Sequence, residues 1–205
     1  MTFDEIIHCL SATDQKIIKD MMSLYEEIGR QTINFAGQTG LRCKVGCGAC
    51  CETPEIETTV AEVLPLAVYL WSEGIAQNIL ETLRADPSQG VCALYQPEVS
   101  HKGNGRCGIY AYRPALCRLF GFAARSDKYG QKVLATCRVI KENQPELCQG
   151  TQEKLHNGLQ APLLSAHTFA VSNIDPVHGL TPLPINQAIR LALEKVGYNI
   201  QNNGC

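Results

Sequence analysis

The chain has 205 residues and a formal net charge of −2, with 45% hydrophobic and 19% charged residues. At roughly 100–200 residues per domain, this length predicts one globular domain over residues 1–205 with a buried core. The small net charge provides no electrostatic footprint for a phosphate backbone, so we expect no nucleic-acid partner.

The N-terminus and the hydropathy pattern indicate a cytoplasmic protein without a membrane-spanning segment. The first five residues are acidic where a secretory signal would be basic. Uninterrupted apolar runs stay well below the ~20 residues of a transmembrane helix. Because cytoplasmic thiols stay mostly reduced, the eleven cysteines favour metal binding or thiol chemistry over a disulfide framework.

The first predicted element is a helix over about residues 13–36, where apolar side chains recur at helical spacing. Either Ser11 or Thr13 can serve as its N-cap. The following segment, 37–51, contains four glycines and has neither a helical nor a strand period. It is therefore predicted as a loop.

A second helix is predicted from Thr59 to Trp71. Thr59 and Glu62 have the spacing of a capping box, which satisfies two N–H groups at a helix start. Pro65 should kink this helix or delay its start, because proline lacks the N–H that a helix interior uses. A third helix is predicted over 75–83.

The middle of the chain has less regular structure. Residues 88–118 carry three further cysteines and are predicted as irregular. Residues 119–125 and 131–136 flank a polar turn with a glycine, which predicts a β-hairpin.

The C-terminal part, about residues 150–197, is predicted to be helical. Its last helix has Pro184 at its first helical position and ends at Gly197. Together these elements predict a mainly α fold with a small β-hairpin. Irregular cysteine-rich loops, about residues 43–137, are organised around a metal centre in this interpretation.

The strongest signal is the run Cys43-Lys-Val-Gly-Cys47-Gly-Ala-Cys50-Cys51, which places four thiols in nine residues. Short spacings let one turn of backbone direct several sulfurs to one point, as structural zinc and iron-sulfur sites require. The glycines within the run, at 46 and 48, permit positive φ and close approach of N–H groups to sulfur. The adjacent side chains of Cys50 and Cys51 are expected to diverge and not to bind the same small ion.

Further candidate ligands follow at longer separations and need tertiary folding to assemble. Cys137, at the end of the predicted hairpin, is equally consistent with packing and with an eighth ligand position. Arginines 42, 106, 118 and 138 each adjoin a cysteine, and cations lower a thiol pKa. The predicted metal ligands are Cys43, Cys47, Cys50, Cys51, Cys92, Cys107, Cys117 and Cys137.

The remaining cysteines and the histidines have simpler interpretations. Cys9 and Cys148 are interpreted as small buried side chains, and Cys205 as an exposed tail thiol. The five histidines show no paired ligand spacing, and only His101 lies between candidate ligands. Four aromatic residues are expected to shield the site from water: Tyr110, Tyr112, Phe120 and Phe122.

The segment Arg113-Pro114-Ala-Leu-Cys117-Arg118 combines a proline with two cations. Proline fixes φ near ~−65° and favours an extended residue before it, so Arg113 should precede a helical turn that presents Cys117. The Arg113 guanidinium can either donate a hydrogen bond to a ligand sulfur or bind an anionic substrate. We expect Arg113 and Arg118 to contact the cofactor.

The cysteine pattern resembles the YkgJ-type cysteine-cluster family, described as a zinc- or iron-chelating domain. The resemblance rests on the tight group Cys43, Cys47, Cys50 and Cys51 that ends in Cys-Cys, the single Cys92, and the run Cys-x-Ile-Tyr-x-x-Arg-Pro-x-x-Cys-Arg-x-Phe over 107–120. It covers roughly residues 43–122. Family members are often labelled iron-sulfur oxidoreductases without a defined reaction, and a similar group occurs in flagellin lysine methylase. Three residues separate the first two cysteines here, where many relatives have two.

Several functions stay open at the level of the sequence. An iron-sulfur cluster or iron, with a redox or electron-transfer role and an unknown redox or protein partner, is favoured by the number of soft thiolates. The main alternative is a zinc-stapled structural or interaction module. The spacing of the first three cysteines also matches radical S-adenosylmethionine enzymes, but an alanine precedes the third cysteine where an aromatic residue is usual. A redox thiol switch is a further alternative, and the sequence leaves open whether the protein is an enzyme.

Overall fold

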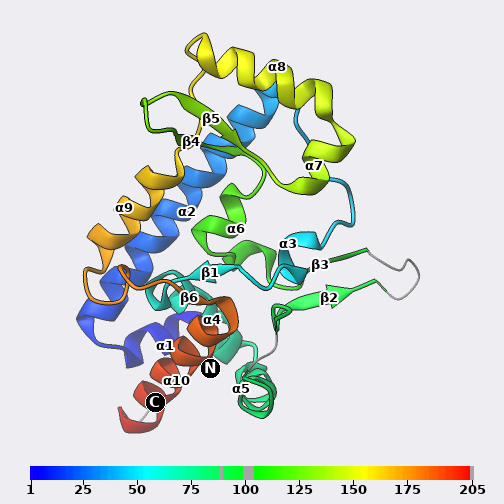
Figure 1. Ribbon diagram of the computed structural model, residues 1–205. Helices are drawn as coiled ribbons and strands as arrows, with labels where there is room; N and C mark the ends of the chain where they lie inside the picture. Colours follow the sequence, from blue (N-terminus) through cyan, green and yellow to red (C-terminus); the bar gives the residue numbers. More distant parts are fainter. Residues whose placement is uncertain (88–89, 99–103, 204–205) are drawn as a thin grey trace.

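The computed structural model describes residues 1–87, 90–98 and 104–203 and confirms a mainly α fold with small antiparallel sheets (Figure 1). The helices are α1 (Phe3–Cys9), α2 (Ala12–Thr39), α3 (Ala49–Glu52), α4 (Val60–Ser72), α5 (Ala76–Ala85), η1 (Tyr110–Tyr112, a 3₁₀ turn), α6 (Ala115–Leu119), α7 (Arg138–Asn143), α8 (Pro145–His156), α9 (Leu164–Ile174) and α10 (Ile185–Asn202). The strands are β1 (Glu57–Thr58), β2 (Tyr95–Pro97), β3 (Gly105–Cys107), β4 (Ala123–Ser126), β5 (Lys132–Ala135) and β6 (Leu183–Pro184). Within the described part of the chain, no helix is both long and apolar enough to cross a membrane.

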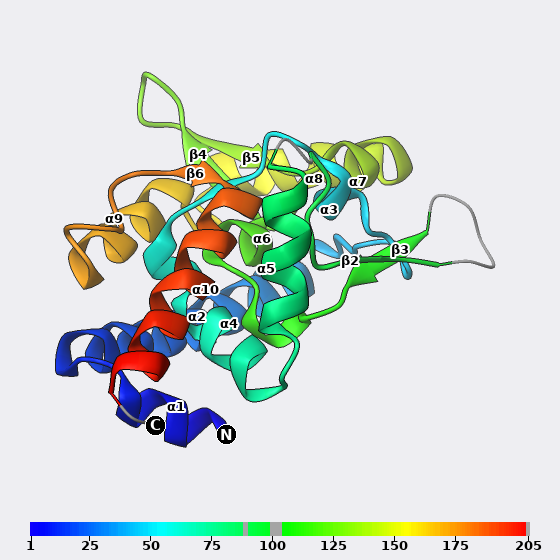
Figure 2. The ribbon, with the colours of Figure 1, turned by 90° about the horizontal axis from the view of Figure 1, so that it is seen from below.

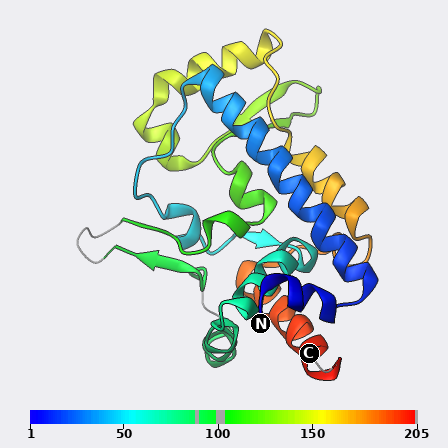
Figure 3. The ribbon, with the colours of Figure 1, turned by 180° about the vertical axis from the view of Figure 1, so that it is seen from behind.

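Helix α2 runs through the length of the molecule, from α1 at one end to α8 at the other (Figure 3). Its N-cap is Ser11, whose Oγ accepts a hydrogen bond from the Asp14 N–H at 3.1 Å. Gly40 ends the helix at φ 77°, in the left-handed region that favours glycine. The helix predicted over 13–36 is confirmed, and it continues through Gly37 because one glycine costs a helix only about 1 kcal/mol.

Helix α4 confirms the predicted capping box. The Glu62 N–H donates to Thr59 Oγ1 at 3.3 Å, and the Thr59 N–H donates to Glu62 Oε2 at 3.1 Å. The expectation of a late start at Pro65 is wrong, because α4 is helical from Val60 onward with the proline inside it. Nearly every side chain of α4 is buried, and this packing offsets the hydrogen bond that proline cannot make.

Helix α10 packs along α4, as the view from below shows (Figure 2). The Trp71 indole N–H donates to the Leu193 carbonyl at 3.0 Å. The predicted helix end at Gly197 is wrong, since α10 continues to Asn202. Gly197 instead permits close packing, because a Cβ there would lie 2.6 Å from the Trp71 ring.

The predicted hairpin is confirmed as the antiparallel pair β4 and β5, with Ala123 opposite Ala135 and Ser126 opposite Lys132. The prediction that all of 88–118 is irregular is wrong. Strands β2 and β3 pair with Tyr95 opposite Cys107. Three-residue strands carry no readable period, so only the pairing itself reveals them.

The cysteine-bearing elements lie between two layers of structure (Figure 1). One layer contains α1, α4, α5 and α10 with most of the buried core, and the other contains α7, α8 and the β4–β5 hairpin with a smaller core. Between them lie α3, α6 and the β2–β3 pair. This arrangement puts cysteines from distant segments at the junction of the two cores.

Candidate metal centre

Eight cysteines from five separate segments of the chain line two adjoining cavities. They come from the 43–51 loop with α3, the segment before β2, the end of β3, α6, and the residue before α7. These are the cysteines predicted as ligands, and all are free thiols: Cys43, Cys47, Cys50, Cys51, Cys92, Cys107, Cys117 and Cys137. Their function as metal ligands stays a prediction.

The inner cavity is small and apolar, with about 20 Å³ of free space. Its walls include Leu66 of α4 and Ile185 and Ile189 of α10, together with Leu94. Five cysteines face it: Cys50, Cys51, Cys92, Cys107 and Cys117. The Cys92 N–H donates to the Cys51 carbonyl at 2.9 Å, which fixes the segment before β2 against α3.

The Cys51 thiol is the centre of the inner group, because the sulfurs of Cys107, Cys50 and Cys92 all lie close enough to compete for its single S–H. These contacts raise the pKa of Cys51 well above its usual range. The nearby S–H of Cys51, which can be donated to one sulfur at a time, lowers the pKa of Cys50 to about 6 and that of Cys107 to about 7, and it also lowers the pKa of Cys92. Without metal, Cys51 and Cys117, whose pKa burial raises, therefore stay protonated, whereas the pKa shifts of Cys50, Cys92 and Cys107 favour the thiolate form.

The expectation that Cys50 and Cys51 diverge is wrong, since their thiols form a hydrogen bond and line the same inner cavity. Both residues lie on the helical turn α3. Successive side chains on a helix are only about 100° apart, so two neighbours can reach one cavity.

The outer cavity is larger and open, with about 260 Å³ of free space. Its cysteines are Cys43, Cys47, Cys50, Cys117 and Cys137. Partial burial raises the pKa of Cys43 to about 11, with further contributions from Cys47 and Cys137. Phe120 and Phe122 line this cavity, as expected for a shielding role.

Tyr110 also lines the outer cavity, although 65% of its surface is exposed, so its shielding role stays a prediction. The ring lies against the Arg113 guanidinium, whose carbon is 3.5 Å from the ring centroid. Tyr112 faces the inner cavity and stacks on Tyr69 at 4.5 Å between ring centroids.

Two glycines position the cysteine loop for different reasons. Gly46 has φ 72°, as expected. Gly48 has φ −105° and does not use the positive φ that a glycine permits. A Cβ at Gly48 or at Gly105 would lie 2.3 Å from the Tyr95 ring, so this ring fits between the loop and β3 only because both residues lack a side chain. The Gly105 N–H also donates to the Gly46 carbonyl at 2.8 Å.

Arg113 faces both cavities. Its position confirms the predicted local geometry, with Arg113 extended at ψ 139° and Pro114 at φ −64° before the turn α6. Its positive charge lowers the pKa of Cys50, Cys107 and Cys117, although burial raises that of Cys117 overall. The fold thus places Arg113 beside these thiols, although it does not adjoin a cysteine in the sequence. The arginines that do adjoin a cysteine are those at 42, 106, 118 and 138.

The hydrogen-bond donor that Arg113 places beside the thiols suits a metal centre of net negative charge. Arg113 Nε is buried and has no hydrogen-bond partner among the described residues, so it is available to a ligand sulfur or an anion. Within the described ranges, no three histidine, cysteine or acidic side chains are already arranged to hold a metal ion. The thiols contact one another instead, and metal binding requires them to rotate and lose protons.

Arg118 holds the backbone beside the site. Its Nε donates to the Arg113 carbonyl at 2.8 Å, and its Nη2 donates to the Ala111 carbonyl. The guanidinium also lies over the Tyr25 ring, 4.4 Å from the centroid. The predicted contact of Arg118 with a cofactor stays a prediction, and its observed contacts orient the segment that contains Arg113.

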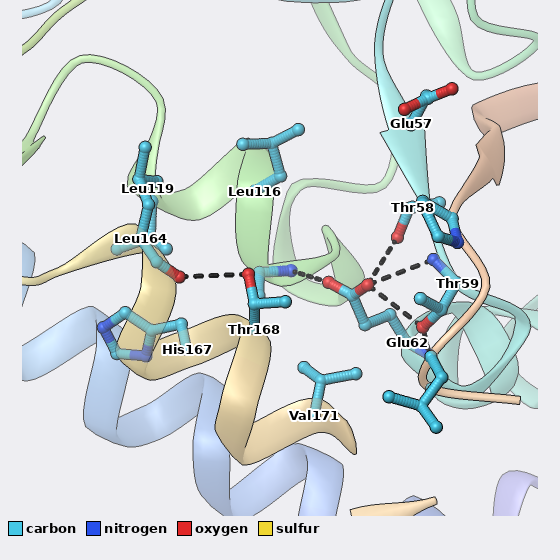
Figure 4. A pocket seen from close by; sticks show the side chains of 14 residues that line it. Glu57, Thr58, Thr59, Glu62, Leu116, Leu119, Leu164, His167, Thr168 and Val171 are labelled. Atoms are coloured by element: carbon cyan, nitrogen blue, oxygen red, sulfur yellow. Dashed lines mark hydrogen bonds between the residues drawn. The ribbon is translucent and has the colours of Figure 1, made fainter. Parts of the chain in front are cut away.

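Glu62 is a buried residue whose effect on the site the sequence did not reveal. Its Oε1 accepts a hydrogen bond from the Ala115 N–H at 3.0 Å, and its Oε2 accepts from Thr58 and Thr59 (Figure 4). The carboxylate thereby fixes the first turn of α6, which carries Cys117. The capping box was readable in the sequence, but the contact with Ala115 spans 53 residues and was not.

A further cavity of about 360 Å³ lies on the other side of α6 and is largely apolar (Figure 4). Leu116 and Leu119 of α6 face it, with Val171 and His167 of α9. Burial lowers the pKa of His167 and favours the neutral imidazole. Helix α6 therefore separates this cavity from the cysteine groups.

The remaining cysteines and the histidine singled out in the sequence either have a packing or capping role or lie outside the described residues. Cys137 is the N-cap of α7, and its sulfur accepts from the Ile140 N–H at 3.4 Å while the side chain lines the outer cavity. Cys148 is partly buried in the smaller core, and burial raises its pKa. Cys9 is buried as predicted, but it is also disulfide-bonded, which the sequence interpretation did not include. His101 and Cys205 lie outside the described residues.

The chain matches the model of the CxxCxxCC family, described as a "putative zinc- or iron-chelating domain", over residues 42–162. No curated protein and no solved structure matches it. The matched range contains all eight cysteines of the two cavities together with Arg113. Since the match covers more than half of the 205 residues, the chain belongs to this family of cysteine-cluster metal-chelating domains.

Proposed function

We propose that this protein binds iron as an iron-sulfur centre through its cysteine thiolates and takes part in electron transfer or a redox reaction. The observation that supports this most is the convergence of eight free cysteines on two adjoining cavities, with no histidine among the described residues that line them. One tetrahedral zinc ion uses four ligands, whereas soft thiolates in larger numbers are typical of iron-sulfur sites. An iron-sulfur centre would supply one-electron chemistry.

The residues around the thiols suit such a centre. The apolar walls of the inner cavity exclude water, and solvent exclusion tunes the potential of a cluster. The Arg113 guanidinium offsets the negative charge of several thiolates and supplies a buried N–H donor. Thiolate ligands must stay reduced, and we therefore propose a reducing compartment, the cytoplasm, as the site of action, with a redox or protein partner that is unidentified.

A structural zinc site is the second candidate. It is favoured by the contact of one thiol, Cys51, with three others, Cys50, Cys92 and Cys107, because four thiolates complete a tetrahedral zinc site. In that case the protein is a zinc-stapled structural or interaction module. The radical S-adenosylmethionine alternative is weaker, because the described residues form only two-stranded antiparallel sheets and no strand-helix barrel.

Anaerobic purification followed by elemental analysis and a visible spectrum tests the proposal. From cells supplied with both metals, we expect brown protein with iron and acid-labile sulfide that bleaches in oxygen. Colourless protein with stoichiometric zinc would refute the iron-sulfur assignment and support the zinc module.

A further inference from the structure

The eight cysteines divide between cavities of unequal access. Cys51, Cys92 and Cys107 face only the inner cavity, which has about 20 Å³ of free space. Another three, Cys43, Cys47 and Cys137, face only the outer cavity of about 260 Å³. The remaining two, Cys50 and Cys117, line both. Each cavity thus has three cysteines of its own and shares two with its neighbour.

The contacts among the thiols follow the same division. Within the inner group, the sulfurs of Cys92 and Cys107 lie close enough to Cys51 to compete for its S–H. Within the outer group, Cys43 forms a hydrogen bond with Cys47 and also interacts with Cys137. Cys50 interacts with members of both groups. The shared cysteines therefore stand where a thiolate could bridge two metal positions.

The two groups also differ in what must move before a metal ion can leave. Cys51 is 7% exposed, and the inner cavity is closed by side chains of α4 and α10 from the main core. Cys43 is exposed, and the rim of the outer cavity includes Ile33, which is 76% exposed. A metal ion can leave the inner cavity only when the packed core opens. A metal ion in the outer cavity can leave when only a surface loop moves.

We infer that the cysteines form two metal positions of different lability: a retained inner position at Cys51, Cys92 and Cys107, and an exchangeable outer position at Cys43, Cys47 and Cys137. The inference rests on the proposed metal-binding function but holds for iron or zinc. Cys50 and Cys117 complete both positions.

Release of the native metal to an excess of a strong chelator, followed under anaerobic conditions, tests this division. Wild-type protein should lose metal in two phases whose rates differ by roughly tenfold or more, because core opening adds a free-energy cost. Cys137→Ser should remove the fast phase and keep the slow one. Cys43→Ser, at an exposed position, should do the same if the first variant folds poorly. Cys92→Ser should reduce the slow phase.

The matched control is Cys148→Ser, a free thiol that lines neither cavity and should change neither phase. A single phase in wild-type protein, or equal metal loss in Cys137→Ser and Cys92→Ser, would overturn the two-position inference while leaving metal binding intact. Purified wild-type protein without any bound metal would instead refute the proposed function, and the inference with it.

Discussion

At the scale of single residues, Arg113 connects the fold to the chemistry of the thiols. Its buried Nε lacks a partner among the described residues, and its charge lowers the pKa of Cys50 and Cys107. A guanidinium offers several donors in a fixed plane, whereas lysine offers the same charge on a flexible stem. The geometry of this side chain, and not only its charge, should therefore affect the centre.

Arg113→Lys should keep the fold but lower metal retention or shift the reduction potential of the centre, because the planar donor group is lost. Metal content per chain, the visible spectrum and the potential measured by redox titration check this. Arg125→Lys, at an exposed position of strand β4, is the matched control. If Arg113→Lys leaves all three quantities unchanged, Arg113 does not contact the centre and the substrate-binding role becomes the better account.

The thiol pKa values predict how metal binding responds to pH. Cys43, Cys51 and Cys117 have raised pKa values and are protonated near neutral pH, so a metal ion must displace their protons. Cys50 and Cys107, with pKa values of about 6 and about 7, add further competition as the pH falls through that range.

Metal affinity should therefore decrease steeply from about pH 8 to about pH 6, and binding should release protons into a weakly buffered solution. Competition with a chromophoric chelator across this range measures the affinity, and an indicator dye measures the protons. An affinity that does not depend on pH would show that the ligands are already ionised or are not these thiols.

At the scale of elements, the loop 43–51 is fixed to the β2–β3 pair by the ring of Tyr95. Gly48 and Gly105 both lie against the Cε2 edge of the ring, and the Tyr95 hydroxyl donates to Glu52 at 3.1 Å. This packing aligns α3, which carries Cys50 and Cys51, with Cys107 on β3. Strand pairing alone, over three residues, would be too short to hold this register.

Gly105→Ala should destabilise the protein by about 1–3 kcal/mol, because its Cβ would lie 2.3 Å from the Tyr95 ring and force the loop and strand apart. Metal retention should fall with it. Gly150→Ala in α8 is the control, since a Cβ there meets nothing within 4 Å and alanine favours helices. Urea unfolding measures the stability of both variants. Equal stabilities of Gly105→Ala and Gly150→Ala would contradict the proposed packing of Gly105 against Tyr95.

The sequence predicted those elements whose signals are local. The capping box at Thr59, the extended residue before Pro114 and the β4–β5 hairpin each depend on a few adjacent residues, and each was predicted correctly. Contacts that join distant segments were not predictable from one chain. Glu62 with Ala115 and the Tyr95 ring between two glycines are examples.

At the candidate site, too, local signals were predictable from the sequence and contacts between distant segments were not. Cysteine spacing pointed to the thiols and to the family, but it could not reveal that Cys50 and Cys51 share one cavity. Nor could it reveal that Cys137 both caps α7 and faces the cavity of Cys43. The assignment of these cysteines to inner and outer groups depends on packing between two cores, which sequence separation does not encode.

At the scale of the whole molecule, the cysteine centre lies where the two cores meet, with α2 running past both (Figures 1 and 3). Metal bound there would link segments from residue 43 to residue 137 and would close several long loops at once. Because the binding free energy of a structural metal is also folding free energy, the centre should tie the two layers together.

The central claim is that the eight cysteines of the two cavities are the metal ligands, and alkylation mapping tests it most directly. Metal-loaded protein is treated anaerobically with a thiol-specific reagent and each cysteine is quantified by mass spectrometry, before and after gentle metal removal. We predict that all eight are protected in the loaded protein and become reactive after removal, most clearly the exposed Cys43, while Cys148 reacts equally in both states. Equal reactivity of Cys43, Cys47 and Cys137 with and without metal would contradict the account.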